Sequence, residues 1–383
     1  MRPTLSILDA HGREARLPPP TPPMRASGWI WIVLVAAALA AALLSLVRYT
    51  PEVWPGGPYP LVGTSVAWLP VARVPSQLAQ LRDPVHWDRA FEYRQGNSLR
   101  WRLLLPVVGH DLRLTPTQYF LLPWVGAFWL LALSGWYAYR ASSSLPRAAA
   151  AVALTATFST WFTATGWIGY MDPFYVGALL VVAFSPSQIA LWGACLLAPW
   201  VDERFLLILP ACWLLRVSRR GDVSRGAWLP MLGIAPYCLA RLAALANGDY
   251  SVGAHVALQS ESFNTYVAGV PLGWWHGFRA GWIPIAIALA AAWRALPGWR
   301  RPGLLLALGA GLGAVVCAAA DTSRSIAVLL PFAVLGAALA RPPWLVWVLA
   351  AANFLLPAAH VSGCGMANKP KVAVVPITCG LLR

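Results

Sequence analysis

Long apolar stretches separated by short charged turns make up most of the chain. An uncharged apolar run of about 20 residues is long enough to cross a bilayer as a helix. The pattern predicts about eleven membrane-spanning helices. They are expected at Gly28–Val47, Gln118–Tyr139, Ala148–Gly169, Phe174–Phe184, Gln188–Trp200, Phe205–Val217, Ala227–Ala246, Phe278–Trp293, Gly303–Ala320, Ile326–Ala340 and Trp344–Ala359.

The turns between these segments alternate in charge, and this alternation predicts the orientation of the chain. Lys and Arg are enriched in cytoplasmic turns of membrane proteins. Placing the Arg-rich turns inside puts the amino terminus in the cytoplasm and the carboxyl terminus outside. Only Asp9, Glu14 and Asp222 then lie inside, so the other carboxylates gather on the outer side. Ionisable groups at the edge of a bilayer are costly to place and usually belong to a site.

Composition agrees with an all-α polytopic membrane bundle. Of the 383 residues, 58% are hydrophobic and 11% are charged, whereas a soluble domain carries about 25% charged residues. A water-soluble fold is therefore not expected. The net charge of +15 does not indicate nucleic-acid binding, because the arginines lie in turns between apolar segments rather than on one soluble face.

The chain divides into three parts. Residues 1–27 are Pro-rich and predict a disordered cytoplasmic tail. Residues 28–359 form the membrane domain, with a long outer loop at 48–117, and the first apolar run is expected to stay as an uncleaved anchor. Residues 360–383 form a non-cytoplasmic tail. It contains Cys364 and Cys379, for which we expect a disulfide, since oxidation persists outside the cytoplasm.

The apolar pieces between Phe174 and Val217 are each shorter than a usual span. One long span over residues 174–200 would turn the Arg216 cluster outward, against the charge bias, whereas three short passes keep it inside. Short passes place backbone and polar groups at membrane depth, which is tolerated where they line a cavity. Asp202, Glu203 and Arg204 would then lie at the outer mouth of such a cavity; the alternative is an ordinary turn that caps the helix at Phe205.

The first outer loop contains two carboxylates with the spacing of one helical face. Asp83-Pro84 predicts the start of a helix over 83–94, on which Asp88 and Glu92 lie four residues apart. The cationic residues Arg82, His86 and Arg89 lie on another face of the same helix. Carboxylates beside cationic groups would suit a site that deprotonates a hydroxyl next to an anionic phosphate. A solvated helix with ordinary surface ion pairs explains the same pattern.

Two further acids precede predicted spans. Asp172, followed by Pro173, is interpreted as an N-cap of the fourth span. Asp321 or Ser323 would cap the tenth, which leaves Arg324 in its first turn, where the helix dipole disfavours a cation. Pairing with a lipid phosphate or with Asp321 would explain that arginine. No metal-ligand spacing such as C-x-x-C occurs; the sequence requires no cofactor and leaves a divalent metal open.

Together these features resemble the polytopic glycosyltransferases of the GT-C type. The resemblance rests on the acid-bearing first outer loop, the stretch Leu99-Arg-Trp-Arg-Leu-Leu-Leu-Pro106 that contains Arg102, the turn Val201-Asp-Glu-Arg-Phe205, and Asp321-Thr-Ser-Arg-Ser325 followed by Pro331. The first loop departs from the family in lacking an adjacent acidic pair.

The resemblance implies transfer of a sugar, with inversion, from a polyprenyl-phosphate donor to a glycan, lipid or protein acceptor outside a bacterial cytoplasmic membrane. Asp88 or Glu92 would activate the acceptor. Substrate would be bound by Asp202, Glu203, Arg204, Asp321, Arg324 and Arg102. We expect Asp88, Arg324 and the acids at 202–203 to line one outward-facing cavity. The alternative is a non-catalytic glycan translocase or assembly component of an envelope pathway.

Overall fold

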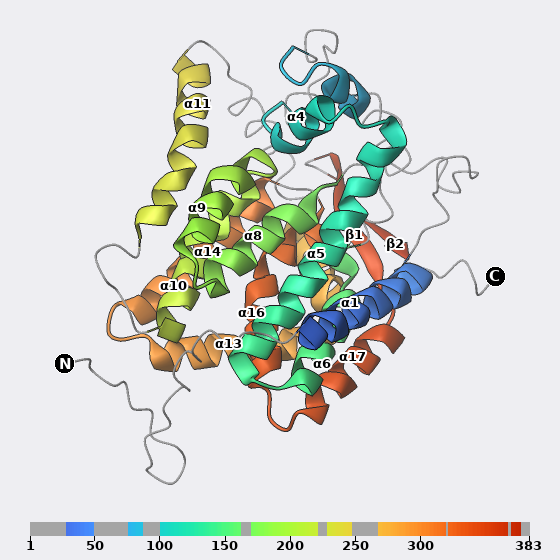
Figure 1. The fold of residues 1–383 in the computed structure, drawn as a ribbon, viewed down its shortest axis with the longest axis vertical. Coiled ribbons are helices and arrows are strands. Elements are labelled where there is room, and N and C mark those ends of the chain that lie inside the picture. The colour runs from blue at the N-terminus through green and yellow to red at the C-terminus, as the bar shows by residue number, and fades with distance from the viewer. Residues whose placement is uncertain are drawn as a thin grey trace.

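The computed structural model describes residues 28–49, 76–86, 100–161, 170–220, 228–246, 267–318, 321–366 and 369–376. Helices predominate in these parts of the chain (Figure 1), as the sequence predicts, and the described strands form one two-stranded sheet. The first half contains α1 (Gly28–Tyr49), α4 (Leu104–Asp111), α5 (Pro116–Ser142), α6 (Leu145–Ala156), η2 (Ser159–Trp161), α8 (Asp172–Phe184), α9 (Gln188–Leu197), η3 (Ala198–Trp200) and α10 (Arg204–Arg220).

The second half adds η4 (Leu229–Ile234), α11 (Ala235–Ala246), a helical segment over 267–278, η5 (Arg279–Gly281), α13 (Trp282–Ala295), α14 (Arg300–Ala318), α15 (Thr322–Ser325), η6 (Ile326–Leu329), α16 (Leu330–Leu339), α17 (Trp344–Leu355), β1 (Ala359–Met366) and β2 (Lys369–Pro376). Every segment that was predicted to span a membrane overlaps a helix. The third is shorter than predicted, because α6 ends at Ala156.

Three of the described helical stretches are long and apolar enough to cross a membrane: Pro116–Ser142, Leu229–Ala246 and Thr322–Leu339. Shorter apolar helices accompany them at Ile30–Ala42, Leu145–Ala156, Asp172–Phe184, Gln188–Trp200 and Trp344–Leu355. The number of spans, about eleven, therefore stays a prediction.

The stretch from Thr322 to Leu339 lies at the centre of the bundle. In this stretch of 18 residues 94% of the positions are buried inside the protein, whereas in Leu229–Ala246, which ends with α11, only 17% are buried. Its α16 portion packs on α13, α5 and α6. The contact with α13 is close because Gly336 has no side chain: a Cβ there would lie 1.7 Å from the backbone oxygen of Pro284.

Helices α8 and α10 pack together, and arginines of α10 bind both ends of α8. At the carboxyl end of α8, Arg216 donates to the carbonyl oxygens of Val182 (3.3 Å) and Ser185 (2.6 Å), and Arg219 donates to that of Ala183 (3.4 Å). These carbonyls have no partner within their own helix, and cations at a helix carboxyl terminus favour its dipole. The other end of α8 meets Arg204, which belongs to the site described below.

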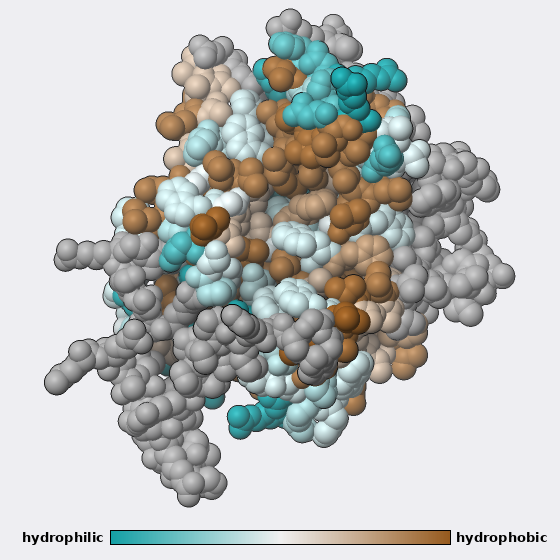
Figure 2. Space-filling view, viewed as in Figure 1, coloured by the Kyte–Doolittle hydropathy of each residue, from teal (hydrophilic) through white to brown (hydrophobic). Residues whose placement is uncertain are grey.

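Large apolar side chains remain on the outside of the bundle. Ile32, Leu242 and Leu306 are 70%, 61% and 71% exposed. Figure 2 shows apolar residues across the middle of one face and polar residues gathered at the end where α4 lies. Large contiguous apolar surface on a protein marks contact with a membrane or a partner, and here it agrees with insertion of the helices in lipid.

Two expectations change, one for the carboxy-terminal tail and one for the loop at 48–117. The predicted carboxy-terminal tail contains the antiparallel hairpin β1–β2, in which Ala359 pairs with Pro376 and Met366 with Lys369. Cys364 lies in β1, whereas Cys379 lies outside the described residues, so the disulfide stays a prediction.

The helix predicted over 83–94 is only partly covered by the structure. Residues 84–86 form a turn rather than a helix, and residues 87–94 are not among those described. The carboxylate of Asp83 accepts hydrogen bonds from the backbone N–H of Val85 (3.3 Å) and His86 (3.0 Å), as a capping residue does. A helix instead precedes Asp83, over residues 76–82.

Gly336→Ala is expected to destabilise the protein, because a methyl group cannot fit between α16 and the backbone of α13 unless the helices separate. Overpacking of this kind costs about 1–3 kcal/mol. Gly309→Ala on α14 is the matched control, since a Cβ there meets nothing within 4 Å. The measurement is the thermal unfolding midpoint of both purified variants; equal midpoints would contradict the close approach.

Candidate functional site

A buried carboxylate at the first residue of α8 lies at the centre of the site. The Asp172 side chain is 2% exposed, and its Oδ1 accepts from Arg204 Nη2 (2.7 Å) and from Arg324 Nη2 (2.9 Å). Its Oδ2 accepts from Arg324 Nε. The N-cap interpretation of Asp172 is therefore wrong. Met171 occupies the N-cap position and the helix has no side-chain cap hydrogen bond, while the Asp172 carboxylate joins two arginines from distant segments.

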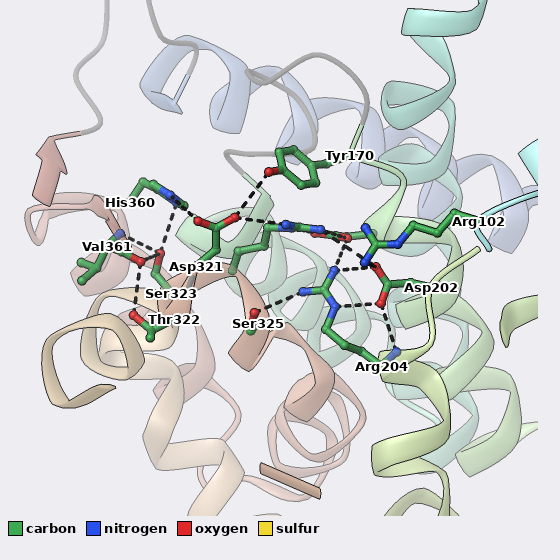
Figure 3. A network of polar contacts seen from close by, with 12 residues as sticks. Arg102, Tyr170, Asp202, Arg204, Asp321, Thr322, Ser323, Ser325, His360 and Val361 are labelled. Atoms are coloured by element: carbon green, nitrogen blue, oxygen red, sulfur yellow. Dashed lines mark hydrogen bonds and ion pairs between the residues drawn. The ribbon is translucent and has the colours of Figure 1, made fainter. Parts of the chain in front are cut away.

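Asp202, just before α10, is the second shared carboxylate. Its Oδ1 accepts from the backbone N–H (3.0 Å) and the Nε (2.8 Å) of Arg204, and its Oδ2 from Arg204 Nη2 (2.7 Å). Arg102 Nη2 lies 3.2 Å and Arg324 Nη2 4.0 Å from the same Oδ2. Asp202 thus caps the start of α10 and neutralises arginines from three segments at once (Figure 3).

Asp321 extends the network toward the carboxy-terminal hairpin. Its Oδ2 accepts from Arg324 Nη1 (3.1 Å) and from the Tyr170 hydroxyl (3.4 Å), and its Oδ1 lies 3.5 Å from His360 Nε2. The guanidinium of Arg324 also lies 3.5 Å from the centre of the Tyr170 ring, a cation–π contact. Asp321 occupies the N-cap position of α15 without a side-chain cap bond, because its carboxylate is bound to Arg324 instead.

The hairpin is attached to the same region through hydroxyl groups. Ser323 Oγ accepts from the backbone N–H of Val361 (2.9 Å), and Thr322 Oγ1 donates to the oxygens of Val361 (3.2 Å) and Gly269 (3.1 Å). Ser323 therefore does not cap the tenth helix but binds β1. Figure 3 shows Ser323, Thr322 and Val361 grouped near His360, with Asp321 between His360 and the arginines.

The exposed edge of the network is formed by Arg102 and Glu203. Arg102 donates through Nε to Glu203 Oε2 (3.4 Å) and through Nη2 to Glu203 Oε1 (3.2 Å). The Glu203 side chain is 40% exposed and that of Arg102 is 19% exposed, whereas Arg204 is 4% exposed. Solvent therefore reaches the network at this pair.

Charges inside the network are mutually compensated. Three arginines face four carboxylates, and the innermost members are almost fully buried. Burial on its own raises the pKa of Asp202, but the charges of Arg102 and Arg204 and the hydrogen bonds from Arg204 hold that pKa well below its usual range. Burial likewise raises the pKa of Asp321, and the hydrogen bond and charge of His360, together with Arg324, bring it below the usual value. Both carboxyls are ionised at neutral pH.

The structure brings all six predicted substrate-binding residues into one cluster: Asp202, Glu203, Arg204, Asp321, Arg324 and Arg102. The predicted catalytic residues, Asp88 and Glu92, lie outside the described residues. Sequence reasoning missed Asp172, Tyr170 and His360. A signal for Asp172 was present, because it is an acid at the outer end of a predicted span, but the following proline made capping the simpler interpretation.

Comparison of the chain with protein-family models, with curated proteins and with solved structures found no match. Within the described residues, no group of three or more His, Cys, Asp or Glu side chains is arranged to hold a metal ion. The chemistry of the site must therefore be argued from its own contacts.

Asp172→Asn is expected to destabilise the protein strongly, since the amide carries no charge to balance Arg204 and Arg324. Removing one partner of a buried ion pair costs about 3–5 kcal/mol. Asp83→Asn is the matched control, because the Asp83 side chain is 54% exposed. The yield of monodisperse protein and its unfolding midpoint would report the difference; a stable Asp172→Asn protein would mean that the network does not hold the helices.

Stability is expected to fall in acid. The folded pKa values of Asp202 and Asp321 are lowered relative to an unfolded aspartate, at about 3.9. Their contribution is therefore complete above that value and is lost as pH falls through the folded pKa values. Unfolding midpoints should be level between about pH 8 and 5 and should drop below about pH 4. Asp202→Asn should start lower and show a smaller acid loss; midpoints that rise on acidification would contradict this.

Proposed function

We propose that the chain is an integral membrane glycosyltransferase of the GT-C type. It transfers a sugar from a polyprenyl-phosphate donor to an acceptor on the non-cytoplasmic face. The observation that carries the proposal is the convergence of Arg102, Asp202, Glu203, Asp321 and Arg324, from segments far apart in the sequence, at one place. An active site assembled from several loops on one side of a membrane bundle requires such a convergence.

The proposed location is a bacterial cytoplasmic membrane, with about eleven spans, the amino terminus inside and the carboxyl terminus outside. The apolar exposed helices support insertion in lipid, and the Arg-rich turns support the orientation. In this orientation the network lies at the outer ends of the helices, since α8, α10 and α15 all begin there.

In the proposed reaction, the acceptor hydroxyl attacks the anomeric carbon of the sugar with inversion. The bond from that carbon to the phosphate oxygen breaks, polyprenyl phosphate leaves, and the hydroxyl proton passes to a carboxylate. Asp88 is the proposed base, with Glu92 beside it. Asp202 is a poor base because its pKa is lowered and its oxygens are occupied by arginines. Glu203 is the accessible carboxylate of the network and the next candidate.

The contacts of Arg324 change its proposed role. The sequence left a lipid phosphate or Asp321 as its partner, and its three nitrogens face Asp172 and Asp321. Arg324, like Arg204, therefore acts in this proposal as a positioning residue that fixes the outer ends of the helices. Binding of substrate falls to groups at the exposed edge.

One observation favours a second function. The buried arginines are neutralised by the protein's own carboxylates, as in a network that only holds helices together. A non-catalytic translocase of lipid-linked glycans, or an assembly component of an envelope pathway, needs such a network and no base. The two functions differ in whether removal of a carboxylate base abolishes sugar transfer.

Asp88→Asn is expected to abolish transfer and leave folding intact, because the amide keeps the shape of the side chain but accepts no proton. Loss of a general base costs about 10²–10⁴-fold in rate. The measurement uses right-side-out vesicles, acceptor in the outer medium, and a panel of radiolabelled polyprenyl-phosphate hexoses and pentoses.

Asp83→Asn serves as the control in the same loop and should keep full activity. Full activity in Asp88→Asn would move the base to Glu92 or Glu203. Full activity in single substitutions at all three, or absence of transfer by the unmodified protein, would leave the translocase or assembly function as the better one. Transfer only to acceptor on the cytoplasmic side would contradict the orientation.

A further inference from the structure

Hydrogen-bond donors without acceptors gather beside the exposed edge of the network. The Nε1 of Trp101, the hydroxyl of Tyr237 and the Nη1 of Arg241 are buried, and none has a hydrogen-bond partner within the described parts of the chain. A buried polar group that stays unpaired costs free energy, so natural structures rarely leave one without a reason. Three such groups in one place require a common explanation.

Contacts between these side chains place them together. The guanidinium of Arg241 lies 4.4 Å from the centre of the Trp101 ring. Tyr237 and Arg241 are four residues apart on α11, so they share a face of that helix. The Tyr237 ring packs edge-on against Trp200, with centroids 5.0 Å apart, and lies within range of the charges of Glu203 and Arg102. We call Trp101, Arg102, Tyr237 and Arg241 the donor cluster.

Among the described residues, the positive charge of Arg241 in the donor cluster has no carboxylate partner. Arg102 is paired with Asp202 and Glu203. If Arg102 moves away, Asp202 still has its contacts with Arg204. An indole N–H, a phenol and a guanidinium in neighbouring side chains suit an anion with several acceptor oxygens.

We infer that the donor cluster is a binding site for the phosphate of a long-chain lipid. The phosphate would accept from Arg241, Tyr237 and Trp101, while Arg102 turns from Glu203 toward it. This inference deepens the proposed function by assigning the phosphate to the donor cluster, and it rests on that function for the identity of the lipid.

The position of α11 favours a lipid phosphate over a free one. Arg241 lies five residues before the end of α11, about 8 Å along a helix, and that end is on the outer side in the proposed orientation. This is the depth at which headgroup phosphates meet a bilayer core about 30 Å thick. On the same helix Leu239 and Leu242 are 64% and 61% exposed, so the hydrocarbon chain of the lipid would have an apolar surface to follow.

Binding of a radiolabelled C55 polyprenyl phosphate to the full chain in phosphatidylcholine nanodiscs tests the inference. Arg241→Gln should weaken binding about 10-fold or more, because a charge-assisted contact is lost, and Tyr237→Phe should weaken it about 3-fold. Arg300→Gln is the matched control, since Arg300 also lies over a tryptophan, 5.8 Å from the Trp299 ring, but away from the site. It should bind as the unmodified chain does.

Two further probes separate the sources of the phosphate. The C55 polyprenol without phosphate should bind weakly and with no dependence on Arg241. Millimolar inorganic phosphate should not displace the lipid; complete displacement would identify a free-phosphate site and overturn the lipid assignment. Unchanged affinity in both Arg241→Gln and Tyr237→Phe, with unfolding midpoints equal to that of the unmodified chain, would overturn the site itself.

The result is independent of sugar transfer. A chain without transferase activity whose affinity for polyprenyl phosphate depends on Arg241 would keep the donor cluster as a site and reject the proposed function. An active transferase whose affinity for polyprenyl phosphate does not depend on Arg241 would keep the proposed function and reject the donor cluster as the phosphate site.

Discussion

The ion pairs of Asp172 determine how the amino-terminal ends of α8, α10 and α15 are arranged. One carboxylate at the start of α8 binds Arg204 at the start of α10 and Arg324 in α15. Burial of these charges is tolerated only because each has partners of opposite sign. Carboxylates at helix amino termini are also favoured by the helix dipole, whereas the two arginines are not, so the arginines depend on the acids. The ion pairs therefore hold the helices in place, and the packed helices hold the paired charges together.

The same network connects distant parts of the chain to the site. Asp321 and Ser323 hold the hairpin β1–β2 through His360 and Val361, and Asp202 and Glu203 hold the segment before α4 through Arg102. At the other end of the bundle, Arg216 and Arg219 bind the last carbonyls of α8. Helix α8 is thus held by arginines of α10 at both ends, and its position is more constrained than apolar packing alone would require.

Much of this was predictable from the sequence, and the failures have physical causes. Long apolar runs located the helices, since each predicted segment overlaps one, and the clustering of acids on one predicted side pointed to Asp202, Glu203 and Asp321. Pairing could not be predicted, because Asp172-Pro173 has the same local pattern whether the carboxylate caps its own helix or binds Arg324, 152 residues away. The hairpin was missed because its strands follow the last apolar run and lack a long alternating pattern.

The separation between a buried network and an exposed edge limits where chemistry can take place. A substrate that displaced Arg204 or Arg324 from Asp172 would leave a buried charge without a partner, at a cost that few ligand contacts offset. Arg102 can move at lower cost, because Asp202 retains its contacts with Arg204 and Glu203 is already 40% exposed. Any ligand that this region binds must therefore approach through Arg102 and Glu203. The buried arginines then serve to hold Asp202 ionised and fixed beneath that edge, which is the condition for a preorganised site.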